Sequence, residues 1–320
     1  MIGIEKPRAI RRVAFSRLER RISGFNVEIT SRHLYENKNS KMNNETAAFL
    51  RYPGGKQRLL KQLLQHLQPL IVARGRFVEP FMGSGAVFFA LCPERAILTD
   101  LNGELIDLYR GIRNRYTLVW KAYCAFPDTK EGYYRVRDMD SSTLTLAEQA
   151  ARTLYLNRTC FKGMWRHNAE GKFNVGYGGE ARRAVIDKMV LREASYTLRR
   201  SRLRKADFER VIDRCTGDDV IFCDPPYSPS ERDMINGHYV CSKFLFADHQ
   251  RLANALHRAT QRSVQWAMTT SSHPDIVALY PNAVVIPLMM GVGKRPGELS
   301  TTCGEVLICN YRKREDETIF

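Results

Sequence analysis

Apolar side chains recur at the spacing of a helix face soon after position 56. They occupy positions 59, 60, 63, 64, 67, 70 and 71, which predicts an amphipathic helix. Two short apolar runs follow at residues 76–80 and 96–100, and residues 86–91 between them fit the start of a helix. Strand, helix and strand in this order predict a βαβ unit in a parallel sheet.

The remaining pattern continues the α/β rhythm after an interruption that is rich in Gly, Asn and aromatic residues up to Gly179. Helices are predicted at residues 105–123, 146–157, 247–259 and 274–279, and strands at residues 203–208, 220–223, 264–269, 283–287 and 305–311. The last two strands have no helix between them, which predicts a terminal antiparallel hairpin. We therefore expect one α/β domain, residues 46–105 and 187–320, interrupted by a mostly helical insert, residues 106–186.

The charge balance adds a candidate partner. The 320 residues carry a formal charge of +16, which favours a polyanion such as DNA, RNA or an acidic membrane without choosing among them. Residues 1–45 hold ten Lys and Arg against five acids, so we expect a poorly ordered basic extension. DNA contact by this tail and a translation start at Met42 are the alternatives.

The cysteine spacing favours unpaired thiols. The eight cysteines form no CxxC pair and no zinc-like cluster with His, so we expect free buried thiols and no metal. The chain shows no apolar signal core and no run of 18 apolar residues, so we expect no membrane partner. These features predict a soluble protein of a reducing compartment.

The run at 220–223 ends in Asp224, Pro225, Pro226 and Tyr227, a pattern suited to methylating an aromatic amine. The lone pair of such an amine is delocalised, and two hydrogen-bond acceptors on its NH2 group can localise it. We expect Asp224 and the Pro225 carbonyl to be these acceptors, Pro226 to stiffen the loop and Tyr227 to stack on the base. An ordinary turn after a buried strand is the alternative for the tetrapeptide alone.

A second motif indicates a nucleoside cofactor. Phe81, Gly83 and Gly85 lie in a loop between a predicted strand and helix, and Asp100 ends the next strand, near the position of a ribose-binding acid. Position 88 is Phe rather than the third Gly of an NAD-binding motif, and no Walker motif for ATP is present. We therefore expect S-adenosylmethionine, whose sulfonium carries an electrophilic methyl group.

Five ordered motifs resemble the Dam-like DNA adenine-N6 methyltransferases, the alpha group of the D12 class. The motifs are FLRYPGGK at 49–56, FVEPFMGSG at 77–85, TDLN at 99–102, LYLNRTCFKGMWRHNAEGKFNVGYG at 154–178 and VIFCDPPY at 220–227. The resemblance implies a Rossmann-like methyltransferase sheet with a target-recognition insert. It also implies a methyl donor and double-stranded DNA as partners, with the enzyme acting as a monomer or weak dimer. The location it implies is the cytoplasm of a bacterial or phage-infected cell, in association with the nucleoid.

The same resemblance implies roles for individual residues. Those implied to bind the cofactor are Tyr52, Lys56, Glu79, Phe81, Gly83, Gly85, Asp100, Asp207, Phe208 and Asp224. Residues 157–166 resemble the recognition hairpin of the family, and those implied to bind DNA are Arg51, Arg158, Phe161, Lys162, Met164 and Arg166. Phe161 would fill the gap left by a flipped base and Arg166 would read a guanine, whereas the alternatives are a hairpin core and a phosphate contact.

We expect methylation of adenine N6 in GATC, the commonest target of the family. Lys162 and Trp165 replace small polar residues of the best-known members, so the recognised sequence stays open. A basic stretch between positions 182 and 205 is expected to supply phosphate contacts or a solvated helix face. The enzymatic alternatives are cytosine-N4 methylation, for which Ser is usual at position 224, protein-glutamine methylation, for which Asn is typical there, and RNA methylation, against which the duplex-type hairpin argues. The alternative outside enzymes is an inactive DNA-binding regulator. A role in repair, restriction or a mobile element is left open.

Overall fold

The computed structural model describes residues 49–51, 56–168, 170–179, 186–226, 244–289 and 304–312. All of them belong to one compact unit, Ser40–Phe320. The expectations for residues 1–45, Tyr52 and Tyr227 lie outside the described residues. Within the described part of the chain, six cysteines are free thiols and no helix is long and apolar enough to cross a membrane.

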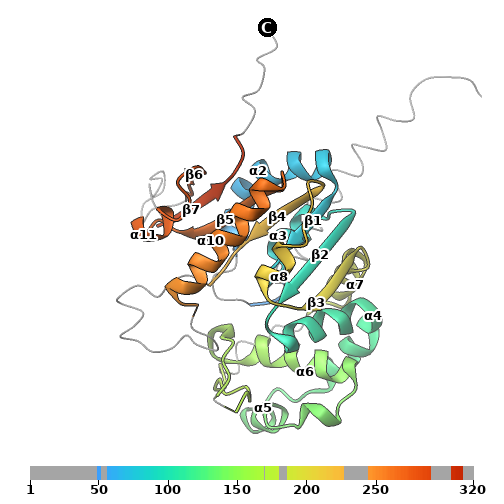
Figure 1. The fold of residues 1–320 in the computed structure, drawn as a ribbon. Coiled ribbons are helices and arrows are strands. Elements are labelled where there is room, and N and C mark those ends of the chain that lie inside the picture. The colour runs from blue at the N-terminus through green and yellow to red at the C-terminus, as the bar shows by residue number, and fades with distance from the viewer. Residues whose placement is uncertain are drawn as a thin grey trace, which may run out of the picture. The chain divides into compact units, whose positions relative to one another are not determined.

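A seven-stranded sheet forms the centre of the structure, with strand order β3-β2-β1-β4-β5-β7-β6 (Figure 1). The strands are β1 (Arg76–Glu79), β2 (Arg95–Asp100), β3 (Ser201–Lys205), β4 (Asp219–Cys223), β5 (Gln265–Ser271), β6 (Val284–Pro287) and β7 (Glu305–Cys309). Neighbouring strands from β3 to β5 are parallel, whereas β7 runs antiparallel to both β5 and β6. The predicted methyltransferase-type α/β fold and its terminal antiparallel hairpin are confirmed.

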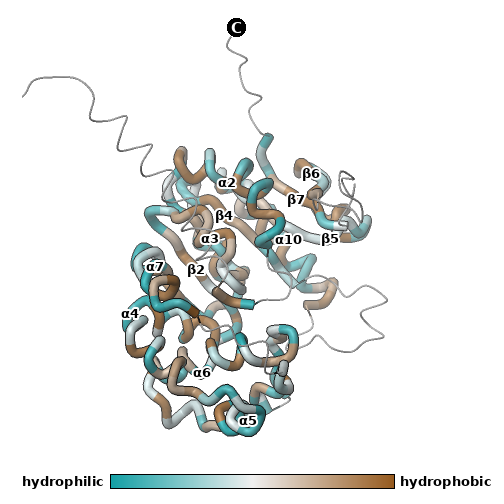
Figure 2. Tube along the Cα trace, turned by 180° about the vertical axis from the view of Figure 1, so that it is seen from behind, coloured by the Kyte–Doolittle hydropathy of each residue, from teal (hydrophilic) through white to brown (hydrophobic). Residues whose placement is uncertain are grey.

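Helices cover both faces of the sheet because successive strand side chains point to opposite faces. Val220 and Phe222 of β4 face one hydrophobic cluster, and Ile221 and Cys223 face the other. The first cluster is covered by α2 (Leu60–Arg74), α3 (Ala86–Leu91), α4 (Gly103–Ala125) and α7 (Lys188–Leu198), which lie toward the viewer in Figure 2. The second is covered by α8 (Phe208–Ile212) and α10 (Phe246–Gln261), and the short helix α11 (Pro274–Val277) precedes β6.

The insert is helical, as expected, and is built on α4. It continues through α5 (Lys130–Arg137), the 3-10 helix η2 (Ser141–Thr143), α6 (Leu146–Thr159) and the 3-10 helix η3 (Phe161–Gly163). Thr145 and Glu148 form a capping box that fixes the start of α6. Buried alanines of α6 pack near Gly111 of α4, where an added Cβ would lie 2.4 Å from the Ala150 Cβ.

Two differences from the predicted elements have local causes. The prediction of a strand at 203–208 was wrong at its carboxyl end. The strand β3 ends at Lys205, because the Asp207 side chain caps the start of α8. The helix α7 was not predicted, although Leu191, Ala194 and Leu198 are buried at helical spacing. The basic residues between them were read as a charged stretch, which hid this apolar face.

Candidate active site

Asp224 follows the last residue of β4 and lies at the carboxyl edge of the sheet. Its Oδ1 atom lies 2.9 Å from the Nζ of Lys56 and accepts a hydrogen bond of 2.7 Å from the Thr269 hydroxyl. Burial raises the pKa of Asp224, whereas the Lys56 ammonium and the Thr269 hydroxyl act in the opposite direction. Among the described residues both contacts fall on Oδ1, so Oδ2 keeps its capacity to accept from another donor.

The two prolines after Asp224 supply carbonyl groups without backbone N–H donors. Pro225 is buried and Pro226 is exposed, so the loop leaves the sheet edge within two residues. The fixed φ of each proline limits the conformations that the Pro225 carbonyl can adopt. The expected acceptors, the Asp224 carboxylate and the Pro225 carbonyl, therefore belong to consecutive residues at the carboxyl edge of the sheet.

Lys56 begins the 3-10 helix η1 (Lys56–Leu59) and is only 5% exposed. Its Nζ also lies 3.6 Å from Oε2 of Glu305. Sequence reasoning placed Lys56 at the cofactor but missed Glu305 and Thr269. The signal for Glu305 is the direction of β7: in a strand antiparallel to β5, the first residue lies beside the carboxyl end of β5, where Ser271 pairs with Glu305.

Glu79, at the end of β1, is a buried carboxyl beside this cluster. It is 2% exposed, and its Oε2 atom has no hydrogen-bond partner among the described residues. Burial, followed by the charges of Asp224 and Asp100, raises the pKa of Glu79 well above its ordinary value. A cationic ligand group beside Oε2 would offset the cost of keeping this carboxylate charged.

Asp100 and the glycine loop come together as the motif spacing predicted. The Gly83 backbone N–H donates to Oδ2 of Asp100 at 3.0 Å, and the Asn102 N–H donates to Oδ1 at 2.9 Å. Gly83 and Gly85 have φ values of 47° and 65°, in the left-handed region that favours glycine. The loop therefore passes close to Asp100, with its backbone held by the acid.

Phe81, in this loop, stacks on Phe208, which is only 3% exposed. Their rings stack with centroids 5.2 Å apart and an interplanar angle of 28°. Asp207 precedes Phe208 and caps α8 by accepting from the Glu209 N–H at 3.0 Å. The backbone reaches the carboxyl end of β2 here, because the Ala206 N–H donates to the Asp100 carbonyl at 3.2 Å. Phe81, Phe208 and Asp207 thus border the same edge as Asp100.

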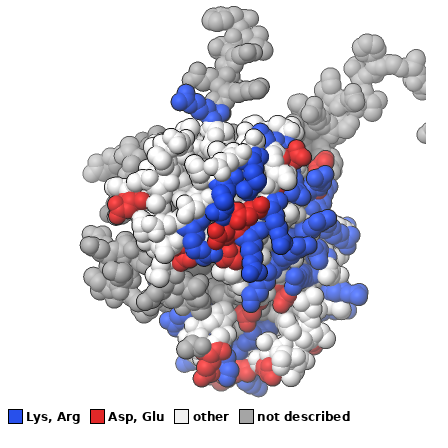
Figure 3. All heavy atoms as spheres, in the orientation of Figure 1, with Lys and Arg blue, Asp and Glu red and all other residues white. Residues whose placement is uncertain are grey.

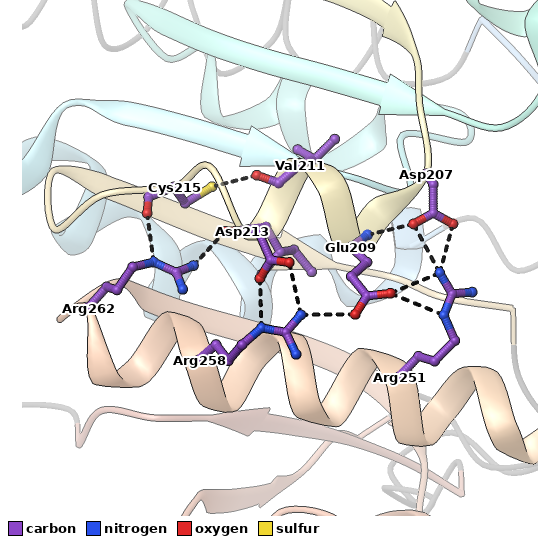
Figure 4. Close-up of polar contacts among 9 residues, drawn as sticks. Asp207, Glu209, Val211, Asp213, Cys215, Arg251, Arg258 and Arg262 are labelled. Carbon is purple, nitrogen blue, oxygen red and sulfur yellow. Dashed lines mark hydrogen bonds and ion pairs between the residues drawn. The ribbon is translucent and has the colours of Figure 1, made fainter.

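A row of arginines on α10 binds the acids at and beside α8, as Figure 4 shows. Arg251 donates to both carboxylate oxygens of Asp207, at 3.1 and 3.2 Å, and its Cζ lies 4.9 Å from the Phe208 ring centroid. Two turns further along, Arg258 binds Glu209 and Asp213, with Nη2 contacts of 2.9 Å to each. Of these two arginines, Arg251 alone contacts both Asp207 and Phe208, the two residues expected to bind the cofactor.

The expected recognition hairpin follows α6. Isolated bridges join Cys160 to Tyr177 and His167 to Phe173, so the two arms run antiparallel. Phe161 is 44% exposed, and Lys162 next to it has a φ of 54°. Gly163 also has a positive φ, and a Cβ there would lie 2.5 Å from the Arg51 Cβ. Glycine at this position therefore lets the hairpin approach the segment that leads to Lys56.

The other residues expected to bind DNA are held by protein contacts. The Arg51 guanidinium donates to the Arg158 carbonyl at 3.1 Å, and its backbone pairs twice with the side chain of buried Asn157. Burial, followed by the charge of Arg51, lowers the pKa of Arg158. Arg166 donates to Asn174 across the hairpin at 2.9 Å, and Met164 packs against the core. Phe161 and Lys162 are the exposed members of the expected set.

Comparison with known proteins agrees with this geometry. The family model of the D12 class N6 adenine-specific DNA methyltransferases matches residues 52–288. A Type II methyltransferase, M1.LlaDCHI of Lactococcus lactis subsp. cremoris, is 29% identical over 82% of this chain and 95% of the relative. A DNA adenine methylase of Serratia marcescens is 30% identical over 68% of this chain and 80% of the relative.

A phage relative matches this chain over a minority of its own length. The DNA N-6-adenine-methyltransferase of Escherichia phage P1 is 35% identical over 73% of this chain but only 31% of its own length. The family match spans the glycine loop with Asp100, the hairpin and the loop after β4. The chain belongs to the D12 class N6 adenine-specific DNA methyltransferase family.

Proposed function

We propose that this methyltransferase acts at the carboxyl edge of β4, where it methylates a flipped adenine of GATC in double-stranded DNA. The observation that carries the proposal is the acid after β4: Asp224 is held by Lys56 at 2.9 Å and by Thr269 at 2.7 Å, with a proline carbonyl next to it. An amine of low nucleophilicity needs two such acceptors to localise its lone pair.

The family implies S-adenosylmethionine as methyl donor, and the described residues fit it. Glu79 offers a buried carboxylate oxygen without a described partner, which suits the cationic amino group of the methionine part. Asp100 would bind the ribose hydroxyls, and Phe81 with Phe208 would border the adenine. When bound, this cofactor supplies a methyl group on a positively charged sulfur.

The chain's own residues then prepare the DNA amine. The Asp224 carboxylate accepts a hydrogen bond from one hydrogen of the amine, and the Pro225 carbonyl accepts a hydrogen bond from the other. Lys56 favours the ionised form of Asp224, since a positive charge 2.9 Å away offsets its burial. Tyr227 would stack on the base. The lone pair of N6 is thereby directed away from the ring and becomes nucleophilic.

The recognition hairpin would deliver the base. Exposed Phe161 suits insertion into a duplex at the position that the flipped adenine leaves, and Lys162 is exposed beside it. Arg51, Arg158, Met164 and Arg166 would support or contact the DNA from the same hairpin region. We propose residues 106–186 as the target-recognition insert of a catalytic domain formed by 46–105 and 187–320, acting as a monomer or weak dimer.

Sequencing the DNA of cells that express the protein tests this proposal. Single-molecule detection of modified bases reports which adenines carry a methyl group and which bases flank them. We expect N6-methyladenine in GATC and none in cells that express Asp224→Ala at the same protein level. A different flanking sequence would overturn the GATC assignment, and unmodified DNA in both strains would overturn the active-enzyme assignment.

A further inference from the structure

Two groups of surface arginines among the described residues have different electrostatic surroundings. Lys and Arg side chains gather around a group of acids on the face seen in Figure 3. On α10, Arg251 and Arg258 bind the carboxylates of Asp207, Glu209 and Asp213. These arginines neutralise local acids and offer little charge to a polyanion.

A second group surrounds the exposed side of α7 and is held by an aromatic ring instead. Tyr196 is 42% exposed, and the guanidinium carbons of Arg192 and Arg199 lie 5.4 and 5.0 Å from its ring centroid. The Arg192 Nε also donates to the Tyr196 hydroxyl at 3.3 Å. A ring orients a guanidinium without cancelling its positive charge, and within the described part of the chain neither arginine forms an ion pair with an acid.

The same surface continues onto a kink in α4. Arg115 has non-helical backbone angles, φ −146° and ψ 38°, which interrupt α4 beside α7. Arg113, Asn114, Arg115 and Arg199 line an open hollow of about 510 Å³. Burial, followed by the charge of Arg110, lowers the pKa of Arg113, so the nearby Arg110 guanidinium repels that of Arg113. A phosphate in the hollow would relieve this repulsion.

This surface lies away from the reacting edge of the sheet. Arg113 donates to the carbonyl of Ser201 at the amino end of β3, whereas Asp224 follows the carboxyl end of β4. Two strands separate β3 from β4, which corresponds to about 14 Å at the usual strand spacing. The five residues of β3 add about 16 Å along the strand direction. Arg202 and Arg204 are exposed on edge strand β3, but they point to the opposite face of the sheet from Leu203, which packs on the α4 and α7 side.

We propose that a surface on α7 and α4 forms a second contact for the phosphate backbone of duplex DNA, away from the proposed reaction site at Asp224. The residues of this surface are Tyr196, Arg192, Arg199, Arg113 and Arg115. The family's substrate is DNA, so the polymer is present wherever the enzyme acts. Phosphate contacts of this kind carry no sequence information and hold the enzyme on DNA that flanks its site. We therefore expect this surface to bind the duplex that flanks the methylated site, and only a long enough DNA substrate contains that duplex.

Binding measured on two lengths of duplex tests the assignment. A duplex of about 12 base pairs spans roughly 40 Å and covers the reacting site, and one of about 40 base pairs spans roughly 140 Å and adds flanking phosphates. The test variant is Arg192→Gln/Arg199→Gln. The matched control is Lys61→Gln/Arg214→Gln, which removes two exposed positive charges from other elements. Thermal melting of both variants confirms that they are folded.

We expect the test variant to bind the long duplex on the order of tenfold more weakly, with a salt slope smaller by about 1.8 for two lost phosphate contacts. Its binding and methylation of the short duplex should equal those of the unmodified protein. Arg192→Lys/Arg199→Lys should restore most of the slope because it keeps the charge. Equal losses of affinity for both lengths of duplex would assign the surface to the reaction site at Asp224 and overturn the proposal. No loss on either length, as for a surface that binds an acidic protein, would also overturn it.

Discussion

The Nζ atom of Lys56 lies 2.9 Å from Oδ1 of Asp224, although 167 positions separate the two residues in the chain. Lys56 is 5% exposed and begins η1, and Asp224 follows β4. A buried ammonium and a carboxyl whose pKa is raised by burial stabilise each other's charged forms. This pair joins the proposed cofactor site to the proposed amine acceptor, and it sets the pH at which Asp224 can act.

Lys56→Met should move the acidic limb of the pH–rate profile to higher pH. In the proposed mechanism Asp224 works as a charged acceptor, so activity should fall as the pH drops through its raised pKa, and removing Lys56 should raise that pKa further. We also expect kcat to fall roughly tenfold to a hundredfold, as for the loss of a charge-assisted hydrogen bond of about 1.5–3 kcal/mol. Lys61→Met, exposed on α2, is the control. An unchanged acidic limb in Lys56→Met would contradict the account.

Glu79→Gln should stabilise the protein in the absence of cofactor. The folded pKa of Glu79 lies above its ordinary value of 4.5, so its folded state is favoured at acid pH and loses stability as the pH rises through the folded pKa. Glu79→Gln lacks this loss of stability, so its Tm should exceed that of the unmodified protein by an amount that grows from about pH 4.5 upward. Each kcal/mol of unfolding free energy corresponds to roughly 2–4 °C in Tm.

The same substitution should weaken cofactor binding about tenfold or more, because a neutral amide replaces the carboxylate that faces a cationic group. Melting curves over a pH series and calorimetric titration with S-adenosylmethionine measure the two effects. A Tm difference that does not change with pH would contradict the titration of Glu79, and an unchanged affinity would contradict its cofactor role.

Arg251→Gln should weaken cofactor binding by about three- to tenfold, whereas Arg258→Gln should leave it unchanged. Both arginines lie on α10 and bind Glu209, but only Arg251 contacts Asp207 and Phe208. The expected size follows from a partly exposed ion pair together with a cation–π contact. Calorimetric titration at equal ionic strength gives both affinities. Equal effects of the two substitutions would show that the row of arginines only supports the fold.

Phe161→Ala should lower kcat/KM on a fully paired duplex about tenfold and have a smaller effect where the target adenine faces a mismatched base. Filling the gap left by a flipped base matters less when the base is already poorly paired. Phe161 is 44% exposed, so the substitution should leave Tm nearly unchanged. Steady-state rates on the two duplexes give the ratio. The same loss on both substrates would rule out a role in base flipping.

The acids that follow parallel strands could be predicted from the sequence, because the carboxyl ends of parallel strands meet at one edge of a sheet. Glu79, Asp100 and Asp224 each end or follow such a strand and lie in one cluster. Thr269 and Glu305 could not be found in this way. Their places depend on which strand lies beside β4 and on the direction of β7, which are properties of the folded sheet.

The hairpin was predicted in position but not in the state of its side chains. The motif at 154–178 located the turn, whereas the contacts of Arg51 with Asn157 and of Arg166 with Asn174 arise from packing between distant segments. Arginine in a sequence carries no signal that separates a DNA contact from a structural hydrogen bond. Exposure in the folded protein supplies that signal, and it singles out Phe161 and Lys162.

Single-turnover methyl transfer by Asp224→Ala tests the central claim most directly. The protein and cofactor are mixed in excess over a duplex that contains the target, and N6-methyladenine is measured by mass spectrometry after hydrolysis. Loss of one of the two acceptors should slow the chemical step about a hundredfold to a thousandfold while the variant still melts cooperatively and binds DNA. A folded Asp224→Ala that methylates adenine at nearly the unmodified rate would contradict the account.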